Sequence, residues 1–100
     1  PDIQKLYDQF IEYGSENKAN ALEVGANIED LDIVDLAKFI DATSNNTMIQ
    51  VFESLQCGSR NHLRSFVNAI ELSGNTYEPQ YLTQEDYILI INDNQEQCGP

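Results

Sequence analysis

The sequence is poor in basic residues. Five Lys and Arg stand against 17 Asp and Glu, which gives a formal net charge of −12 over 100 residues. Binding to nucleic acid depends on clustered Lys and Arg that neutralise phosphates, so this balance argues against a nucleic-acid partner. It equally disfavours docking on anionic lipid. It favours solubility and the attraction of cations or basic partners.

Long apolar runs are also lacking. No segment approaches the roughly 20 apolar residues that a membrane-spanning helix needs, and none has the pattern of a signal peptide or a low-complexity tract. The chain begins at Pro1 without a Met, which indicates a processed or excised piece. The remaining composition, 41% hydrophobic and 22% charged, is that of an ordinary globular domain.

Cysteine is scarce as well. Cys57 and Cys98 are the two cysteines, and neither lies in a Cys-x-x-Cys or zinc-type spacing. A bridge between them would close a loop of about 40 residues and would contribute about 3 to 4 kcal/mol of stability. The alternative is two unrelated thiols. If they are bridged, an extracytoplasmic or secreted location is favoured.

The apolar residues that are present recur at three- and four-residue spacing, which predicts an all-α chain. We expect helices over residues 3–14, 17–42 and 48–73, the first of them capped by Asp2. A last short helix is expected after a capping box at Thr83. Its apolar run, residues 87–91, could instead be a strand, but the chain offers no second strand to pair with it.

The two long helices are joined by a turn over residues 43–47 and should form an antiparallel hairpin of about 38 Å. A hairpin with only short flanking helices cannot bury both of its apolar stripes. We therefore expect either a homo-oligomer or a missing partner segment. The polar tail, residues 92–100, is expected to be mobile.

Polar residues fall on the apolar seam between the two long helices. On the first helix the seam consists of Leu22, Gly25, Glu29, Asp32 and Leu36. On the second it includes Ser59 and His62, the chain's only histidine. Because Glu29 lies about 15 residues before the turn and His62 about 15 after it, the two should meet at one level of the hairpin.

Three interpretations of this seam remain open, because a buried carboxylate is costly unless it is paired, hydrogen-bonded or bound to a metal. In the first, Glu29 and Asp32 accept hydrogen bonds from Ser59, Arg60, His62 or Arg64. In the second, the carboxylates and the imidazole bind a metal, as in di-iron and di-manganese bundles. In the third, the seam is partly exposed to solvent and the cost never arises.

Two other patterns carry little specificity. Asp30, Asp32 and Asp35 resemble a calcium-binding loop only in acidity, because the turn glycine is absent and the segment is helical in pattern. The triplet Asn45-Asn46-Thr47 matches an N-glycosylation sequon, a three-residue pattern that often occurs by chance.

Three segments stand in a characteristic order and spacing: residues 24–36 (VGANIEDLDIVDL), 58–66 (GSRNHLRSF) and 76–82 (TYEPQYL). Together they resemble an uncharacterised microbial ferritin-like family, a domain of unknown function. The resemblance covers residues 1–91. It implies an antiparallel helical hairpin with short flanking helices that forms the second half of a ferritin-like four-helix bundle, which a missing N-terminal helical hairpin would complete.

The resemblance also implies a metal site. The second half of such bundles offers a glutamate, which Glu29 matches, and a Glu-x-x-His motif, whose histidine His62 matches. Ser59 stands at the glutamate position of that motif, so one chain cannot assemble a full dinuclear site. On this resemblance Glu29 and His62 are ligands of iron or manganese, and Asp32 is an auxiliary ligand.

Two functions are therefore expected. The first is half of a carboxylate and histidine metal site of the di-iron type, whose implied chemistry is the oxidation of ferrous iron by dioxygen or peroxide. The second is a non-catalytic, self-associating structural or interaction subunit, in an extracellular setting if the cysteines are bridged. There the polar seam would be metal-free and would fix the register of the helices.

Overall fold

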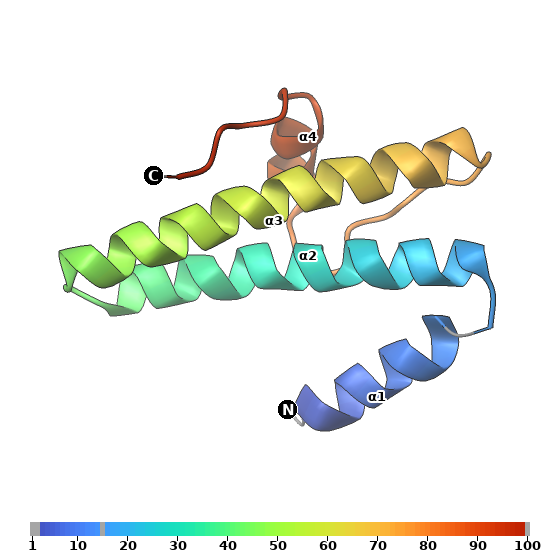
Figure 1. The fold of residues 1–100 in the computed structure, drawn as a ribbon, viewed down its shortest axis with the longest axis horizontal. Coiled ribbons are helices and arrows are strands. Elements are labelled where there is room, and N and C mark those ends of the chain that lie inside the picture. The colour runs from blue at the N-terminus through green and yellow to red at the C-terminus, as the bar shows by residue number, and fades with distance from the viewer. Residues whose placement is uncertain (1–2, 15, 100) are drawn as a thin grey trace.

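Four helices make up the chain in the computed structural model, which describes residues 3–14 and 16–99 (Figure 1). They are α1 (Ile3–Gly14), α2 (Lys18–Ala42), α3 (Asn46–Leu72) and α4 (Gln84–Ile91). The described residues contain no strand, so the all-α prediction is confirmed and the run 87–91 is helical. The predicted cap at Asp2 lies outside the described residues. No helix among them is long and apolar enough to cross a membrane.

Side-chain caps fix where three of the helices begin. Asn17, Asn45 and Thr83 each accept a hydrogen bond from the backbone N–H three residues later, over 2.8, 3.1 and 3.1 Å. Such caps satisfy one of the unpaired N–H groups of the first helical turn. After α3 the chain turns at Gly74, whose φ of 90° is a conformation that favours glycine. Local residue chemistry therefore sets the helix boundaries.

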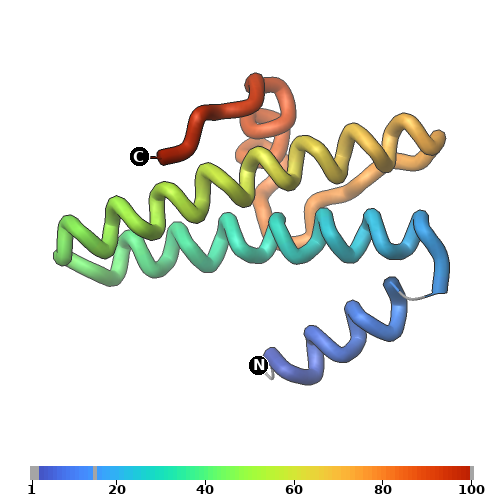
Figure 2. Tube along the Cα trace, viewed as in Figure 1, coloured from blue at the N-terminus to red at the C-terminus, as the bar shows by residue number. Residues whose placement is uncertain are grey.

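The two long helices form the predicted antiparallel hairpin (Figures 1 and 2). In these views α1 lies on one side of the hairpin, and α4 with the tail lies on the other. α1 diverges from α2 and buries none of its side chains. The two short helices therefore cover the hairpin unequally.

The core lies between α2, α3, α4 and the segment that connects α3 to α4. Its buried members are Ala26, Ile33, Leu63, Val67, Ile70, Tyr77 and Tyr87. Gly25 lets the partly buried Phe66 of α3 pack closely on α2, because a Cβ at this position would lie 2.5 Å from the Phe66 ring. The core thus occupies the face of the hairpin that α4 covers, and the opposite face is left with little cover.

A buried carboxylate anchors the segment between α3 and α4. Asp30 is 0% exposed and accepts hydrogen bonds from the backbone N–H groups of Gln80 (2.7 Å), Tyr81 (3.3 Å) and Leu82 (2.7 Å). The Tyr77 hydroxyl also donates to it at 2.7 Å. Burial, and then this contact with Asp30, raises the pKa of Tyr77. One side chain of α2 therefore satisfies three consecutive backbone donors and a tyrosine hydroxyl of this segment.

The tail is attached to α3 by residues 95–98, whereas the sequence predicted a mobile segment. Cys57 of α3 and Cys98 form a disulfide with a Cα–Cα distance of 5.7 Å. Glu96 pairs with Arg60 and Arg64, each over 2.8 Å. The first interpretation of the seam allowed these two arginines to bind Glu29 and Asp32. In the structure they bind Glu96 of the tail instead. The expectation of a free tail is wrong because α3 offers a covalent and an ionic partner to it.

Candidate functional site

An open groove runs along the face of the hairpin that α4 leaves uncovered. It is lined from α2 by Glu29, Asp32, Asp35, Leu36 and Phe39, and from α3 by Ser54, Leu55, Gly58, Ser59 and His62. The lining combines apolar side chains with three carboxylates and an imidazole. The groove therefore holds every residue that the sequence marked as a metal ligand.

Glu29 and His62 face each other across the groove. The Nδ1 atom of His62 lies 3.4 Å from the Oε2 atom of Glu29, so the predicted meeting of the two residues at one level of the hairpin is confirmed. The side chain of His62 is 68% exposed and that of Glu29 is 15% exposed. The imidazole is thus open to solvent or to a ligand, whereas the carboxylate lies deeper between the helices.

Two carboxylates of the groove, those of Glu29 and Asp32, have raised pKa values. Burial raises the pKa of Glu29, and the nearby charge of Asp32 adds to this, while His62 and the hydroxyl of Ser59 act in the opposite direction. The pKa of Asp32 is raised by its own partial burial and by Asp35. A cation or a positively charged side chain in the groove would relieve this cost. The electrostatics therefore suit a positively charged occupant.

The structure corrects the predicted orientation of α2. Asp32 is exposed, so the seam is partly open to solvent, as the third interpretation held. The fully buried carboxylate is Asp30, to which the sequence analysis gave no role. Asp30 shares a helical face with Ala26 and Ile33 at spacings of four and three, and that spacing was the signal that could have found it.

The metal-ligating capacity of the groove is that of a half-site. Glu29 and His62 supply one oxygen and one nitrogen donor, and Asp32 lies in the same groove. Among residues 3–14 and 16–99, no group of three or more His, Cys, Asp or Glu side chains is placed to hold a metal ion. The assignment of Glu29, His62 and Asp32 as ligands stays a prediction, and it requires donors from outside this chain.

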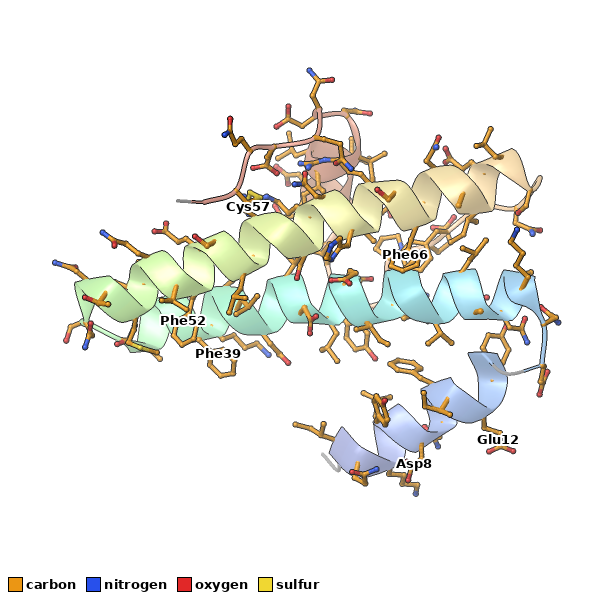
Figure 3. All side chains as sticks on the ribbon, viewed as in Figure 1. Asp8, Glu12, Phe39, Phe52, Cys57 and Phe66 are labelled. Atoms are coloured by element: carbon orange, nitrogen blue, oxygen red, sulfur yellow. A yellow bond between two sulfur atoms is a disulfide. The ribbon has the colours of Figure 1, made fainter. Side chains whose placement is uncertain are left out.

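Apolar surface continues from the groove toward the turn between α2 and α3. Phe39 is 52% exposed and Leu55 is 54% exposed. The ring of Phe39 packs against that of Phe52 with centroids 5.6 Å apart, and both lie at this end of the hairpin in Figure 3. A contiguous exposed apolar surface beside polar groups is typical of an interaction site.

We expect Glu29→Gln to raise the stability of the metal-free chain at pH 7. The pKa of Glu29 is higher in the folded chain than in the unfolded one. Its contribution to stability is therefore present below the unfolded pKa of about 4.3 and is lost as the pH rises through the folded value. Urea unfolding in the presence of a chelator, at pH 4 and pH 7, measures the difference.

The matched control for this variant is Glu53→Gln, an exposed position on the same hairpin. It should leave the stability nearly unchanged at both pH values. A Glu29→Gln chain that is less stable than the parent at pH 7 would contradict the prediction, because the carboxylate would then be stabilised by its surroundings.

The chain is similar to a family model and to an archaeal relative with a solved structure. The relative, described as uncharacterized protein MJ0754 of Methanocaldococcus jannaschii, is 45% identical over 96 residues. The match covers 96% of this chain and 52% of the relative, so the chain spans about half the relative's length. The crystal structure described as hypothetical protein MJ0754 superposes with a TM-score of 0.90 over 93% of this chain and 53% of that one.

The resemblance carried by the three segments is borne out as membership of an uncharacterised family, and its ferritin-like part stays a prediction. The model of the uncharacterized protein domain DUF2202 matches residues 1–94, which include α1 to α4 and the whole groove. At this extent of coverage, the chain belongs to the DUF2202 family.

Proposed function

We propose that the chain is half of a ferritin-like four-helix bundle whose open face contributes Glu29 and His62, with Asp32 beside them, to a carboxylate and histidine metal site. The observation that carries the proposal is the 3.4 Å approach of the Glu29 carboxylate and the His62 imidazole. The two groups come from neighbouring antiparallel helices and line an open groove. Such a pair is part of the ligand set of dinuclear helical-bundle sites.

The donor set fits half of such a site and no more. Imidazole nitrogen and carboxylate oxygen suit iron and manganese. Ser59 stands where the bundle pattern has a glutamate, and its hydroxyl acts on Glu29 as a hydrogen-bond partner. The remaining ligands would come from helices laid over the groove, either from a second copy of the chain or from another helical hairpin. A relative about twice as long supports the second source.

The residues of this chain would act by binding and orienting. A cation in the groove would favour the ionised form of Glu29, which offsets the burial that raises its pKa. Ser59 would fix the orientation of that carboxylate, and the exposed imidazole of His62 needs little rearrangement to bind. The chemistry expected at a completed site that holds iron is the oxidation of ferrous to ferric iron, with dioxygen or peroxide as the oxidant. The Cys57–Cys98 disulfide supports an oxidising, extracytoplasmic compartment.

Metal analysis of the loaded chain tests this proposal. After anaerobic incubation with Fe²⁺ or Mn²⁺ and desalting, we expect the parent to retain metal in a fixed ratio to protein. His62→Ala should lower the retained metal at least tenfold because it removes the exposed nitrogen donor. Elemental analysis by mass spectrometry gives the ratio.

Glu53→Ala serves as the matched control, since Glu53 is an exposed acid of α3 outside the groove. It should retain metal as the parent does. Retention of metal by the parent that is unchanged in His62→Ala would overturn the proposed site. A parent that retains no metal would exclude a second copy of this chain as the source of the remaining ligands.

A second function is supported by the apolar surface beside the groove. The exposed side chains of Phe39, Val51 and Leu55, together with the exposed Ile3 and Ile11 of α1, would allow the chain to self-associate as a structural or interaction subunit. Sedimentation or light scattering distinguishes this case. The self-associating function is favoured if an oligomer forms without metal and forms to the same extent in the Glu29→Gln variant. A molar mass equal to that of one chain counts against this function.

A further inference from the structure

Glu96 of the tail binds α3 through both its side chain and its backbone. The guanidinium of Arg60 donates from Nε and Nη2 to the two carboxylate oxygens of Glu96, each at 2.8 Å. Nη2 of Arg64 donates to Oε2 of Glu96, also at 2.8 Å. A planar guanidinium bound to both oxygens of a carboxylate fixes its orientation as well as its charge. As a result, the pKa of Glu96 is lowered to about 2.

The backbone of Glu96 is bound as specifically as its side chain. The amide of Asn61 donates from Nδ2 to the Glu96 carbonyl and accepts from the Glu96 N–H, both at 2.8 Å. The neighbouring Gln95 donates to the carbonyl of Asn61 at 3.0 Å and to the hydroxyl of Ser65 at 3.1 Å. Paired contacts to one residue's N–H and C=O, with a pocket for its side chain, are how proteins recognise extended peptides.

The receptor side of this contact is held in place by bonds that do not involve the tail. Nε of Arg64 donates to the carbonyl of Ile90 at 2.8 Å, and its Nη1 donates to Asn61 at 2.9 Å. Nη1 of Arg60 contacts the amide oxygen of Gln56 at 3.3 Å. Removal of the tail would therefore leave the two cations in place on α3. Such preorganisation favours the binding of a replacement carboxylate.

The disulfide decides whether the tail can leave. Ordering the residues after α4 costs conformational entropy for each of them. Partly exposed ion pairs contribute little stability in compensation. While Cys98 is bonded to Cys57, the tail cannot diffuse away, so its carboxylate is held beside the arginines at high effective concentration. After reduction to two thiols this constraint is gone, and the tail becomes an exchangeable ligand.

We propose that the face of α3 formed by Arg60, Asn61 and Arg64 is a binding site for an extended acidic peptide, and that the chain's own tail occupies it while the Cys57–Cys98 disulfide is intact. Two of the chain's five basic residues meet here, in a molecule of net charge −12. A partner would present a glutamate whose carboxylate and backbone N–H and C=O groups are all accessible, as those of Glu96 are to Arg60, Asn61 and Arg64. Reduction of the disulfide by a thiol opens the site. This proposal is independent of any metal in the groove.

A labelled peptide with the sequence of residues 93–99, in which Cys98→Ser prevents disulfide exchange, is the probe. Fluorescence anisotropy should detect at least tenfold tighter binding to the reduced full chain than to the oxidised one. The reduced Glu96→Gln chain should bind it more tightly still, because its own tail competes less well. Equal binding to the oxidised and reduced chains would overturn the proposal.

The control peptide carries Glu96→Gln and should bind the reduced chain at least tenfold more weakly, because it lacks the carboxylate that the two arginines hold. Binding of both peptides with equal affinity would also overturn the proposal. Circular dichroism of the reduced chain reports whether its helices persist.

If reduction unfolds the helices, the oxidised Glu96→Gln chain provides a second test. Its disulfide is kept, and its two guanidinium groups have lost their carboxylate. N-acetylglutamate should then shift the NMR signals of the Nε–H groups of Arg60 and Arg64 in this variant and leave those of the oxidised parent unchanged. Signals that stay unmoved in the variant would overturn the site.

Discussion

Replacing Asp30 by alanine is expected to lower the free energy of unfolding by about 3–5 kcal/mol. The carboxylate is completely buried and accepts hydrogen bonds from three backbone N–H groups and the Tyr77 hydroxyl. Alanine would leave the three backbone N–H groups without their acceptor in a partly buried site, while the Tyr77 hydroxyl would keep Asn27 as an acceptor at 2.8 Å. Each unpaired buried donor costs about 1–3 kcal/mol. The segment before α4 should loosen first, because Asp30 binds the N–H groups of residues 80–82.

Chemical denaturation followed by circular dichroism measures this loss, and hydrogen exchange locates it. Asp41→Ala is the matched control, since Asp41 is an exposed aspartate of the same helix. Asp30→Asn should be intermediate, because an amide keeps one acceptor oxygen and puts an N–H group against a donor. A cost for Asp30→Ala below about 1 kcal/mol, close to that of the control, would show that the loop is held by other contacts.

Removing the disulfide with the double variant Cys57→Ser and Cys98→Ser is expected to cost about 3–4 kcal/mol. The two cysteines are separated by 41 positions in the sequence, so the bridge excludes many extended conformations of the unfolded chain. Because the tail is then held only by the non-covalent contacts of Gln95 and Glu96 with α3, we also expect it to be released in a large fraction of molecules. Thermal or urea unfolding measures the first effect.

Limited proteolysis of the folded variant measures the second effect. Cleavage in residues 93–98 should be faster in the double variant than in the oxidised parent, while cleavage within α2 and α3 stays slow. Reduction of the parent should reproduce both results, which controls for the serine substitutions. A variant as stable as the oxidised parent, with a tail that is equally protected, would contradict the assignment of this bridge as a structural strap.

The losses of unfolding free energy expected for Asp30→Ala and for removal of the disulfide are large for a chain of this size. Small domains have about 5–15 kcal/mol of stability in total, and one face of this hairpin contributes little because its apolar residues are exposed. Asp30 and the disulfide both act on the covered side, where they fasten the α4 segment and the tail. The groove side is left free to receive an occupant, at the expense of stability in the isolated chain.

The helices could be predicted from the sequence alone. Spacing of apolar residues and the caps at Asn17, Asn45 and Thr83 act within a few residues of the chain, so they could be recognised without knowledge of the fold. The level at which Glu29 and His62 meet was also predictable, because two helices joined by a short turn must pair residues equidistant from it. Three segments of the sequence predicted membership of an uncharacterised family, and the family match over residues 1–94 confirms it.

Which side of α2 is buried depends on tertiary contacts and could not be predicted from the sequence. Glu29 and Asp30 differ by one position and about 100° around the helix, and both lie on stripes with helical spacing. Asp30 points inward because residues 80–82 present unpaired N–H groups to it, a contact across about 50 positions that no local pattern encodes. The tail was fixed on α3 for a similar reason. The partners of Glu96 and Cys98 lie more than 30 positions away and become neighbours only after the helices have packed.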